Sequence, residues 1–184
     1  SSHYQGTPYD PYAAAAAEKG IYRPIGVNRN DFMALLQMRP DVPEDFRAVE
    51  WLAFASNAFN TMLPFYANVD TTPEYLSNTT GDVSTDNFYW ASRLLAAMAD
   101  ASYAKSVFHI ERYTLSVGAK SNGFINRYDD ALRAEADPAV RAALREKANE
   151  EIAAMAKAET TDALNKVLFE LSSGMKNAYS RSDA

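Results

Sequence analysis

The 184-residue chain contains no cysteine and only two histidines, His3 and His109. A chain without thiols forms no disulfide and no thiolate metal site, and two histidines argue against a multi-histidine metal centre. Any chemistry that depends on a cysteine must therefore take that residue from elsewhere. The sequence also lacks a Gly-rich phosphate loop and the HExxH and GxSxG motifs, so none of these motifs assigns a reaction.

Long hydrophobic runs are missing as well. None approaches the ~20 residues that cross a bilayer, and the first residues do not resemble a signal peptide, so we expect a soluble, cytoplasmic protein. The formal net charge of −6 argues against nucleic acid or an anionic membrane as the main partner. An apolar fraction of 47% is enough for a sizeable core, so the chain is one domain or part of a larger one.

Two apolar runs joined by a polar turn, residues 49–69, form the centre of the sequence. Within them, Trp51–Phe54 and Met62–Tyr66 are apolar at consecutive positions. A strand with one face in water would alternate, so these runs predict strands that are covered on both faces. Pro64 predicts an edge or bulged position for the second strand, because proline cannot donate a hydrogen bond to a neighbour.

A third strand is predicted for the preceding run, Phe32–Arg39, although a capped helix fits the same residues. The proline at position 40 and the length of the run favour the strand, and Asp41–Asp45 then forms a hairpin loop. The three strands predict an antiparallel meander over residues 31–69.

The sequence after residue 84 has a helical period. The cluster Ser84–Asp86 supplies an N-cap, and we expect this first helix to continue to about residue 117. Gly118 and Gly123 are expected to break or bend it before a second stretch, Phe124–Ala134. One apolar face of the first helix is marked by Phe88, Ala91, Leu95, Met98 and Ser102.

A last amphipathic helix is predicted from Asp137 and Pro138 to about Tyr179, with a candidate break at Thr160-Thr161. Two long helices joined by a short turn form an antiparallel pair, and the sheet is the obvious cover for their apolar stripes. The predicted class is therefore α+β, with a small antiparallel sheet followed by a helical layer at 84–180. Residues 1–30 are expected to be an extended surface segment, and residues 70–83 a loop.

Four polar residues are candidates for substrate contacts. Asn57 and Asn60, in the turn between the apolar runs, could hold a substrate or a developing oxyanion through an amide donor. Ordinary turn chemistry is the alternative reading. Arg23 and Arg29 could clamp a carboxylate, since a guanidinium binds it with two hydrogen bonds, and surface ion pairing is their alternative.

His109 and Ser1 are better explained without a catalytic role. His109 lies well inside a predicted helix, and its spacing from Glu111 and Arg112 does not make a tight triad, so a partly buried helix histidine is expected. An N-terminal Ser1 could act as a nucleophile with its own amino group as base. However, Ser1 does not begin a predicted strand, and an N-terminus made by cloning or by proteolysis explains it better.

Several stretches together resemble one family, the bacterial cysteine dipeptidases of the N-terminal-nucleophile hydrolase superfamily. The stretches are YQGTPYDPY (Tyr4–Tyr12), YRPIGVNRNDF (Tyr22–Phe32), VEWLAFASNAFNTMLPFYANV (Val49–Val69) and STDNFYWASRLLAAMAD (Ser84–Asp100). They follow the order of the later half of these proteins and cover most of the chain. The resemblance is strongest at Val49–Val69.

The resemblance implies a four-layer αββα fold and hydrolysis of dipeptides by an N-terminal cysteine, without a metal or organic cofactor. This sequence departs from the pattern because it has no cysteine. We therefore expect a C-terminal fragment that is inactive alone, contains no catalytic residue, and has the missing N-terminal part and a dipeptide as partners. A helical interaction or assembly module without enzymatic activity is the alternative. Exposed sheet edge and apolar surface also predict a homo-oligomer.

Overall fold

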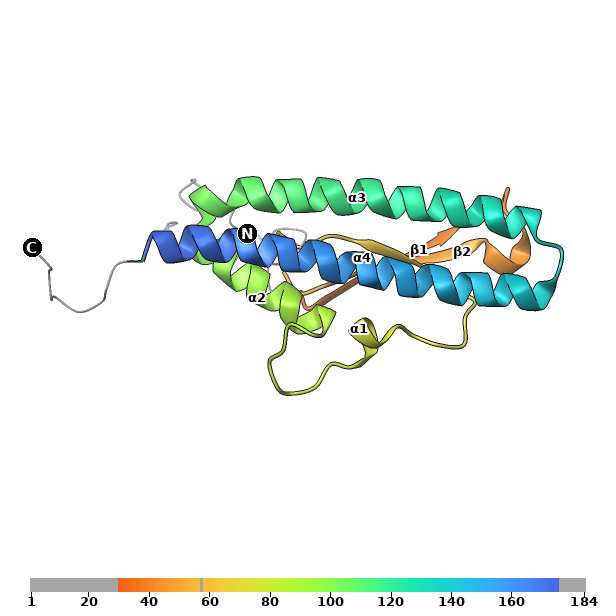
Figure 1. Ribbon diagram of the computed structural model, residues 1–184, viewed down its shortest axis with the longest axis horizontal. Helices are drawn as coiled ribbons and strands as arrows, with labels where there is room; N and C mark the ends of the chain where they lie inside the picture. The colour runs from red at the N-terminus through yellow and green to blue at the C-terminus, as the bar shows by residue number, and fades with distance from the viewer. Residues whose placement is uncertain (1–29, 57, 176–184) are drawn as a thin grey trace, which may run out of the picture.

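The computed structural model describes residues 30–56 and 58–175 and contains a small antiparallel sheet followed by helices (Figure 1). In chain order the elements are β1 (Phe32–Met38), the 3₁₀ turn η2 (Glu44–Phe46), β2 (Ala48–Phe54), β3 (Leu63–Tyr66), α1 (Glu74–Ser77), α2 (Phe88–Ala101), α3 (Tyr103–Ala134) and α4 (Pro138–Ser173). The predicted α+β class is confirmed, as is a strand rather than a helix at residues 32–38.

The sheet is a meander with the strand order β1-β2-β3. Met33 of β1 lies opposite Ala53 of β2, and Leu52 of β2 lies opposite Leu63 of β3, so both pairs are antiparallel as predicted. β3 is an edge strand, the position that Pro64 indicates.

The outer side of β3 is closed by one side chain of α4. The Tyr66 backbone N–H donates to Oδ1 of Asn149 (2.9 Å), and Nδ2 of Asn149 donates to the Tyr66 carbonyl oxygen (3.0 Å). An amide side chain thus makes the two hydrogen bonds that a further strand would make with this residue. Both groups are buried, so the contact satisfies a donor and an acceptor that water does not reach.

Helices cover β3 on both faces. Val49 lies opposite Tyr66 in the β2–β3 pair, and both belong to one core cluster, which α3 and α4 complete with Tyr128, Leu132 and Ala148. The other face of the pair carries Leu63 and Phe65, which pack against residues of α2, α3 and α4. All four residues of β3 are buried. The predicted cover on two faces is therefore confirmed for β3.

α3 and α4 form the predicted antiparallel pair and lie side by side along the length of the molecule (Figure 1). The break predicted at Gly118 and Gly123 is wrong, because α3 is one helix through both positions. A helix glycine costs only about 1 kcal/mol, and Val117 and Ser121, both buried, keep this segment packed. The chain breaks instead at Ser102, between α2 and α3.

Two other helix details differ from the prediction. Asn87, not the cluster at residues 84–86, caps α2, since its side chain accepts a hydrogen bond from the Trp90 N–H. α4 continues through Thr160, whose hydroxyl lies 3.0 Å from the Tyr113 hydroxyl in the core. The predicted start of α4 is confirmed, with Asp137 as N-cap before Pro138.

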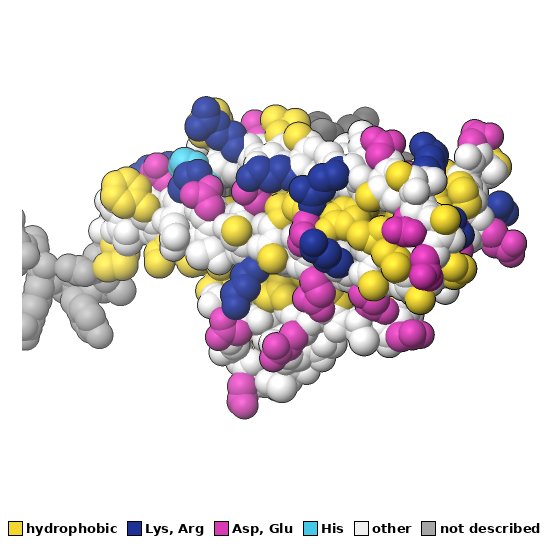
Figure 2. Space-filling view, turned by 45° about the vertical axis from the view of Figure 1, so that its right-hand side comes forward, with side chains coloured by type: hydrophobic (Ala, Val, Ile, Leu, Met, Phe, Trp, Pro, Cys, Tyr) yellow, Lys and Arg dark blue, Asp and Glu magenta, His cyan; other side chains and the backbone are white. Residues whose placement is uncertain are grey.

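Charges of both signs are mixed on the surface. On the described residues of the face in Figure 2, basic and acidic side chains are interspersed, with hydrophobic side chains gathered between them. Ion pairs such as Arg127–Glu151 connect neighbouring helices. None of the helices in the described ranges has the length and apolarity needed to cross a membrane.

Substituting Asn149 tests the closure of the β3 edge. We expect Asn149→Ala to lower the free energy of unfolding by about 3 kcal/mol, because the Tyr66 N–H and carbonyl oxygen would stay buried without partners. The measurement is urea denaturation. Asn165→Ala, at an exposed position of the same helix, is the matched control and should change stability by less than about 0.5 kcal/mol. Equal effects of the two variants would contradict the assignment.

Candidate functional site

The connection between β2 and β3 is the part of the predicted site that the structure describes, apart from residue 57. It leaves β2 through Ala55, whose φ of 66° lies in the left-handed region, and whose N–H donates to the Asp31 carbonyl oxygen (3.0 Å). Phe59 is buried, and its ring packs edge-on against Tyr103 at the start of α3 (6.2 Å between centroids). The turn is thus held against the junction of α2 and α3.

Asn60 has one satisfied and one unsatisfied side-chain atom. Its Oδ1 accepts a hydrogen bond from the Thr61 N–H (2.7 Å), which is ordinary turn chemistry. Its Nδ2 is buried and has no hydrogen-bond partner within residues 30–56 and 58–175. A buried amide donor without an acceptor costs on the order of 1–3 kcal/mol. Other buried side-chain atoms of the described residues share this state, among them Oγ of Ser92 and of Ser121, so a role of Asn60 in substrate binding stays a prediction.

The other predicted contacts cannot be compared with the structure. Asn57, Arg23 and Arg29 lie outside the described residues, as do Ser1 and His3. Among the residues that are described, no group of three or more His, Asp or Glu side chains could hold a metal ion.

His109 is placed as expected for a partly buried helix histidine. It lies on α3, and its Nε2 is 3.5 Å from Oε1 of Glu170 on α4. The partner is thus on the neighbouring helix, rather than Glu111 or Arg112. The contact joins α3 to α4.

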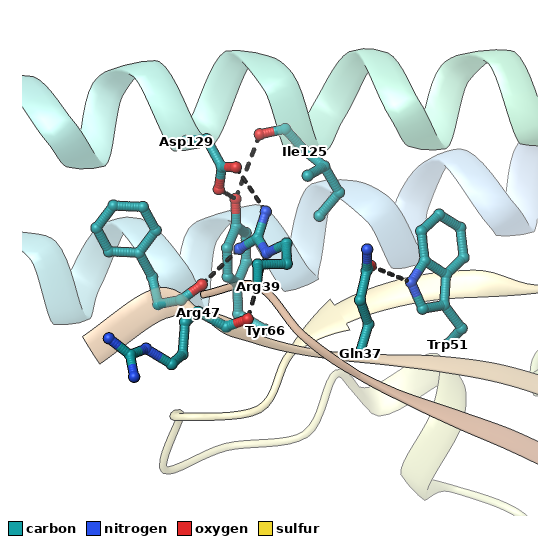
Figure 3. A network of polar contacts seen from close by, with 8 residues as sticks. Gln37, Arg39, Arg47, Trp51, Tyr66, Ile125 and Asp129 are labelled. Carbon is teal, nitrogen blue, oxygen red and sulfur yellow. Dashed lines mark hydrogen bonds and ion pairs between the residues drawn. The ribbon is translucent and has the colours of Figure 1, made fainter. Parts of the chain in front are cut away.

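A buried polar network that the sequence analysis missed connects the sheet to α3 (Figure 3). Arg39, one residue beyond β1, donates through Nη1 to Oδ2 of Asp129 (2.5 Å) and through Nη2 to the Phe46 carbonyl oxygen. The Tyr66 hydroxyl donates to the other oxygen, Oδ1, of Asp129 (2.7 Å). One carboxylate therefore receives hydrogen bonds from the end of β1 and from β3.

Burial and the neighbouring Asp129 raise the pKa of the Tyr66 hydroxyl above its ordinary value, so it is a neutral donor. The Arg39 and Asp129 side chains are only 14% and 11% exposed, which makes this a largely desolvated ion pair. Removing one partner of such a pair would leave the other charge buried without compensation. We assign the network to support of the fold, because the raised pKa of the Tyr66 hydroxyl lies far from neutral pH, where an effective general acid or base must titrate.

α4 makes a second set of polar contacts with the chain that follows β3. Nε of Arg145 donates to the Asn68 carbonyl oxygen (2.8 Å), and Glu146 accepts hydrogen bonds from Asp70 and Thr71. Although its partial burial acts in the opposite direction, these hydrogen bonds lower the pKa of Glu146. Arg145, Glu146 and Asn149 lie within two turns of one helix, so a short part of α4 holds both β3 and the loop behind it.

Comparisons with known proteins agree with the sequence stretches quoted above. Residues 1–116 match the family model described as peptidase family C69. The chain belongs to this family. It is 40% identical over its whole length to "Probable dipeptidase A" of Streptococcus pyogenes, and 36% identical over its whole length to "Dipeptidase" of Bifidobacterium longum. It is also 48% identical to "Dipeptidase A" of Lactobacillus helveticus over 56% of the chain.

The resemblance to bacterial dipeptidases is thus confirmed for a chain of peptidase family C69. The chain spans 39% of the length of the Streptococcus protein and 42% of the Bifidobacterium protein. The C69 match includes β1, β2, β3 and α2, and it therefore contains the turn with Asn60.

The buried tyrosines of this chain predict a loss of stability in alkali. Burial raises the pKa of Tyr113 to about 12, while an unfolded tyrosine has a pKa near 10. Between these values the unfolded state releases a proton that the folded state keeps, so the free energy of unfolding falls as the pH rises from about 10 to about 12. Tyr66 shifts in the same direction.

Urea denaturation at pH 8, 10 and 11 measures this loss. Tyr113→Phe should make the loss between pH 8 and 11 smaller by about 1 kcal/mol, whatever its effect at pH 8. A variant whose stability declines as steeply as that of the parent chain would contradict the assignment to Tyr113.

Proposed function

We propose that the 184 residues are the C-terminal part of a single hydrolase domain that cleaves dipeptides through an N-terminal cysteine nucleophile. Membership of peptidase family C69 and full-chain similarity to proteins named dipeptidase carry the proposal. Two observations support a nucleophile outside the chain: it has no cysteine, and it spans 39% of the length of the Streptococcus relative and 42% of that of the Bifidobacterium relative.

The reaction proposed for the complete enzyme needs no cofactor. The thiol of the N-terminal cysteine attacks the peptide carbonyl carbon, while the α-amino group of the same residue takes the thiol proton. The amine of the second amino acid leaves with a proton, and water then hydrolyses the acyl-enzyme. The tetrahedral intermediate of each step carries a negative oxygen that needs hydrogen-bond donors.

In this proposal the described residues supply a wall of the site and the frame behind it. Asn60 is the one of the four candidates that lies in the described ranges, where its buried Nδ2 has no hydrogen-bond acceptor. We propose that it donates to the substrate carbonyl oxygen or to the oxyanion. Asn57, Arg23 and Arg29 remain candidates from their chemistry alone.

The helical assembly module is the second candidate. Exposed hydrophobic side chains on the helix pair favour it, among them Phe108 and Leu115 of α3 and Phe169 of α4. The full-chain similarity to dipeptidases favours the enzyme instead. A homo-oligomer and a cytoplasmic location also stay predictions, and analytical ultracentrifugation and cell fractionation would test them.

A comparison of the 184-residue chain with the complete protein tests whether the nucleophile lies outside this chain. The 184-residue chain alone should not hydrolyse an unblocked dipeptide such as Leu-Leu, whereas the complete protein should. Replacing the N-terminal cysteine of the complete protein by alanine should abolish hydrolysis without changing the melting temperature. Hydrolysis by the 184-residue chain alone, or full activity of the alanine variant, would contradict the proposal.

Asn60→Ala in the complete protein tests the donor. Loss of one hydrogen bond to the oxyanion should lower kcat/KM by about 100-fold or more, with a similar loss for Asn60→Asp, which keeps the size but not the donor. Asn122→Ala, on the exposed side of α3, is the control and should keep full activity. Unchanged activity in both Asn60 variants would remove Asn60 from the site, and Asn57→Ala is read in the same way.

A further inference from the structure

The backbone hydrogen bonds of β1 leave every second residue facing away from β2. The backbone N–H of Arg39 donates to the Arg47 carbonyl oxygen, and the carbonyl oxygen of Asp31 accepts from the Ala55 N–H. The odd-numbered residues of β1 therefore form the hydrogen-bonded pairs with β2. The N–H and carbonyl groups of the even-numbered residues therefore point to the outer side of β1. These residues are Phe32, Ala34, Leu36 and Met38.

The same reasoning shows that the opposite edge of the sheet is closed. Ala67 donates to the Ala48 carbonyl oxygen, so Leu63 and Phe65 are bonded to β2 while Pro64 and Tyr66 face outward. Pro64 has no N–H to offer, and both backbone groups of Tyr66 are bound by Asn149. A further strand cannot pair with β3 without displacing α4.

The side chains of β1 also indicate an edge that is not closed. Leu35 and Leu36 point to opposite faces of the strand, and they are 57% and 73% exposed. Six of the seven residues of β1 are exposed, and the strand contains no charged residue and no proline. Edge strands of finished sheets are usually protected by charge, proline or a bulge. β1 has the sequence of an interior strand.

We infer that the sheet continues beyond β1, through a strand supplied by the part of the polypeptide that lies outside these 184 residues. The inference rests on the proposed function, and the length of the relatives, more than twice that of this chain, supports this occupant. The added strand pairs with the four outward residues of β1. Leu35 and Leu36 are exposed on opposite faces of β1, so the same part of the protein must place apolar side chains on both faces to cover them.

Hydrogen exchange of individual β1 amides tests the inference in the unmodified protein. In the 184-residue chain, the inward amides of Met33, Leu35 and Gln37 should be protected and the outward amides should exchange rapidly. In the complete protein, the outward amides of Ala34 and Leu36 should exchange on the order of 100-fold more slowly than in the 184-residue chain. Equal exchange rates of these outward amides in the two proteins would overturn the inference.

Two other occupants give different results, and either would overturn the inference. Outward protection that is lost on dilution, together with dissociation of a dimer, would assign the edge to a second copy. Protection that is already present in the monomeric 184-residue chain would assign it to this chain itself.

A pair of substitutions provides an independent test. Ala34→Pro removes an outward N–H and no hydrogen bond to β2, so a true edge strand tolerates it. We expect it to leave the unfolding midpoint of the 184-residue chain unchanged and to increase the exchange rate of the Leu36 amide in the complete protein at least about 10-fold. Ala34→Val, which keeps the N–H, should do neither. An unchanged Leu36 rate in the proline variant of the complete protein would contradict the added strand.

The failure of this inference can be told apart from that of the proposed function. A complete protein that hydrolyses dipeptides while its outward amides exchange freely retains the function and loses the added strand. A complete protein with protected outward amides and no hydrolysis retains the strand and loses the function.

Discussion

The structure depends on the contact between the Asn149 side chain and the backbone of Tyr66. Tyr66 is the last residue of β3, and the amide satisfies its N–H and its carbonyl oxygen in the interior. Without this contact the N–H and the carbonyl oxygen of Tyr66 would stay buried without partners where α4 packs against the edge of the sheet. The side chain of Tyr66 then reaches Asp129, so a single residue is held by both long helices.

The other polar contacts extend the same arrangement. Arg39 brings the end of β1 to the carboxylate of Asp129 that also binds Tyr66. Arg145 and Glu146, one turn before Asn149, hold the loop that leaves β3. Within the described residues, the sheet is therefore closed along its β3 edge and exposed along its β1 edge. The two edges of the sheet thus differ: α4 closes the edge at β3, and no described element closes the edge at β1.

Apolar patterning predicted the three strands, the helix pair and the α+β class, because burial of a strand or a helix stripe leaves a periodic signal. It could not place helix ends that depend on tertiary packing. Gly118 and Gly123 looked like breaks, yet α3 passes through them because its buried side packs against α4. Asn149 left no local signal either, since a polar residue beside Ala148 in an apolar stripe resembles a surface position.

The candidate site was predictable to a smaller extent. The turn with Asn60 follows from the two apolar runs, but the unsatisfied Nδ2 depends on the packing around it. A cysteine nucleophile is implied by the resemblance alone, because the chain contains no cysteine.

The separation of Tyr66 and Asn149 has a consequence for synthesis on the ribosome. Asn149 follows Tyr66 by 83 residues, which corresponds to a delay of roughly 4–17 s at about 5–20 residues per second. Throughout this interval the outer edge of β3 has no side chain to close it. A nascent chain of this kind is open to pairing with a neighbour on the same messenger RNA, and we expect a demand for chaperones that ends only when α4 has emerged.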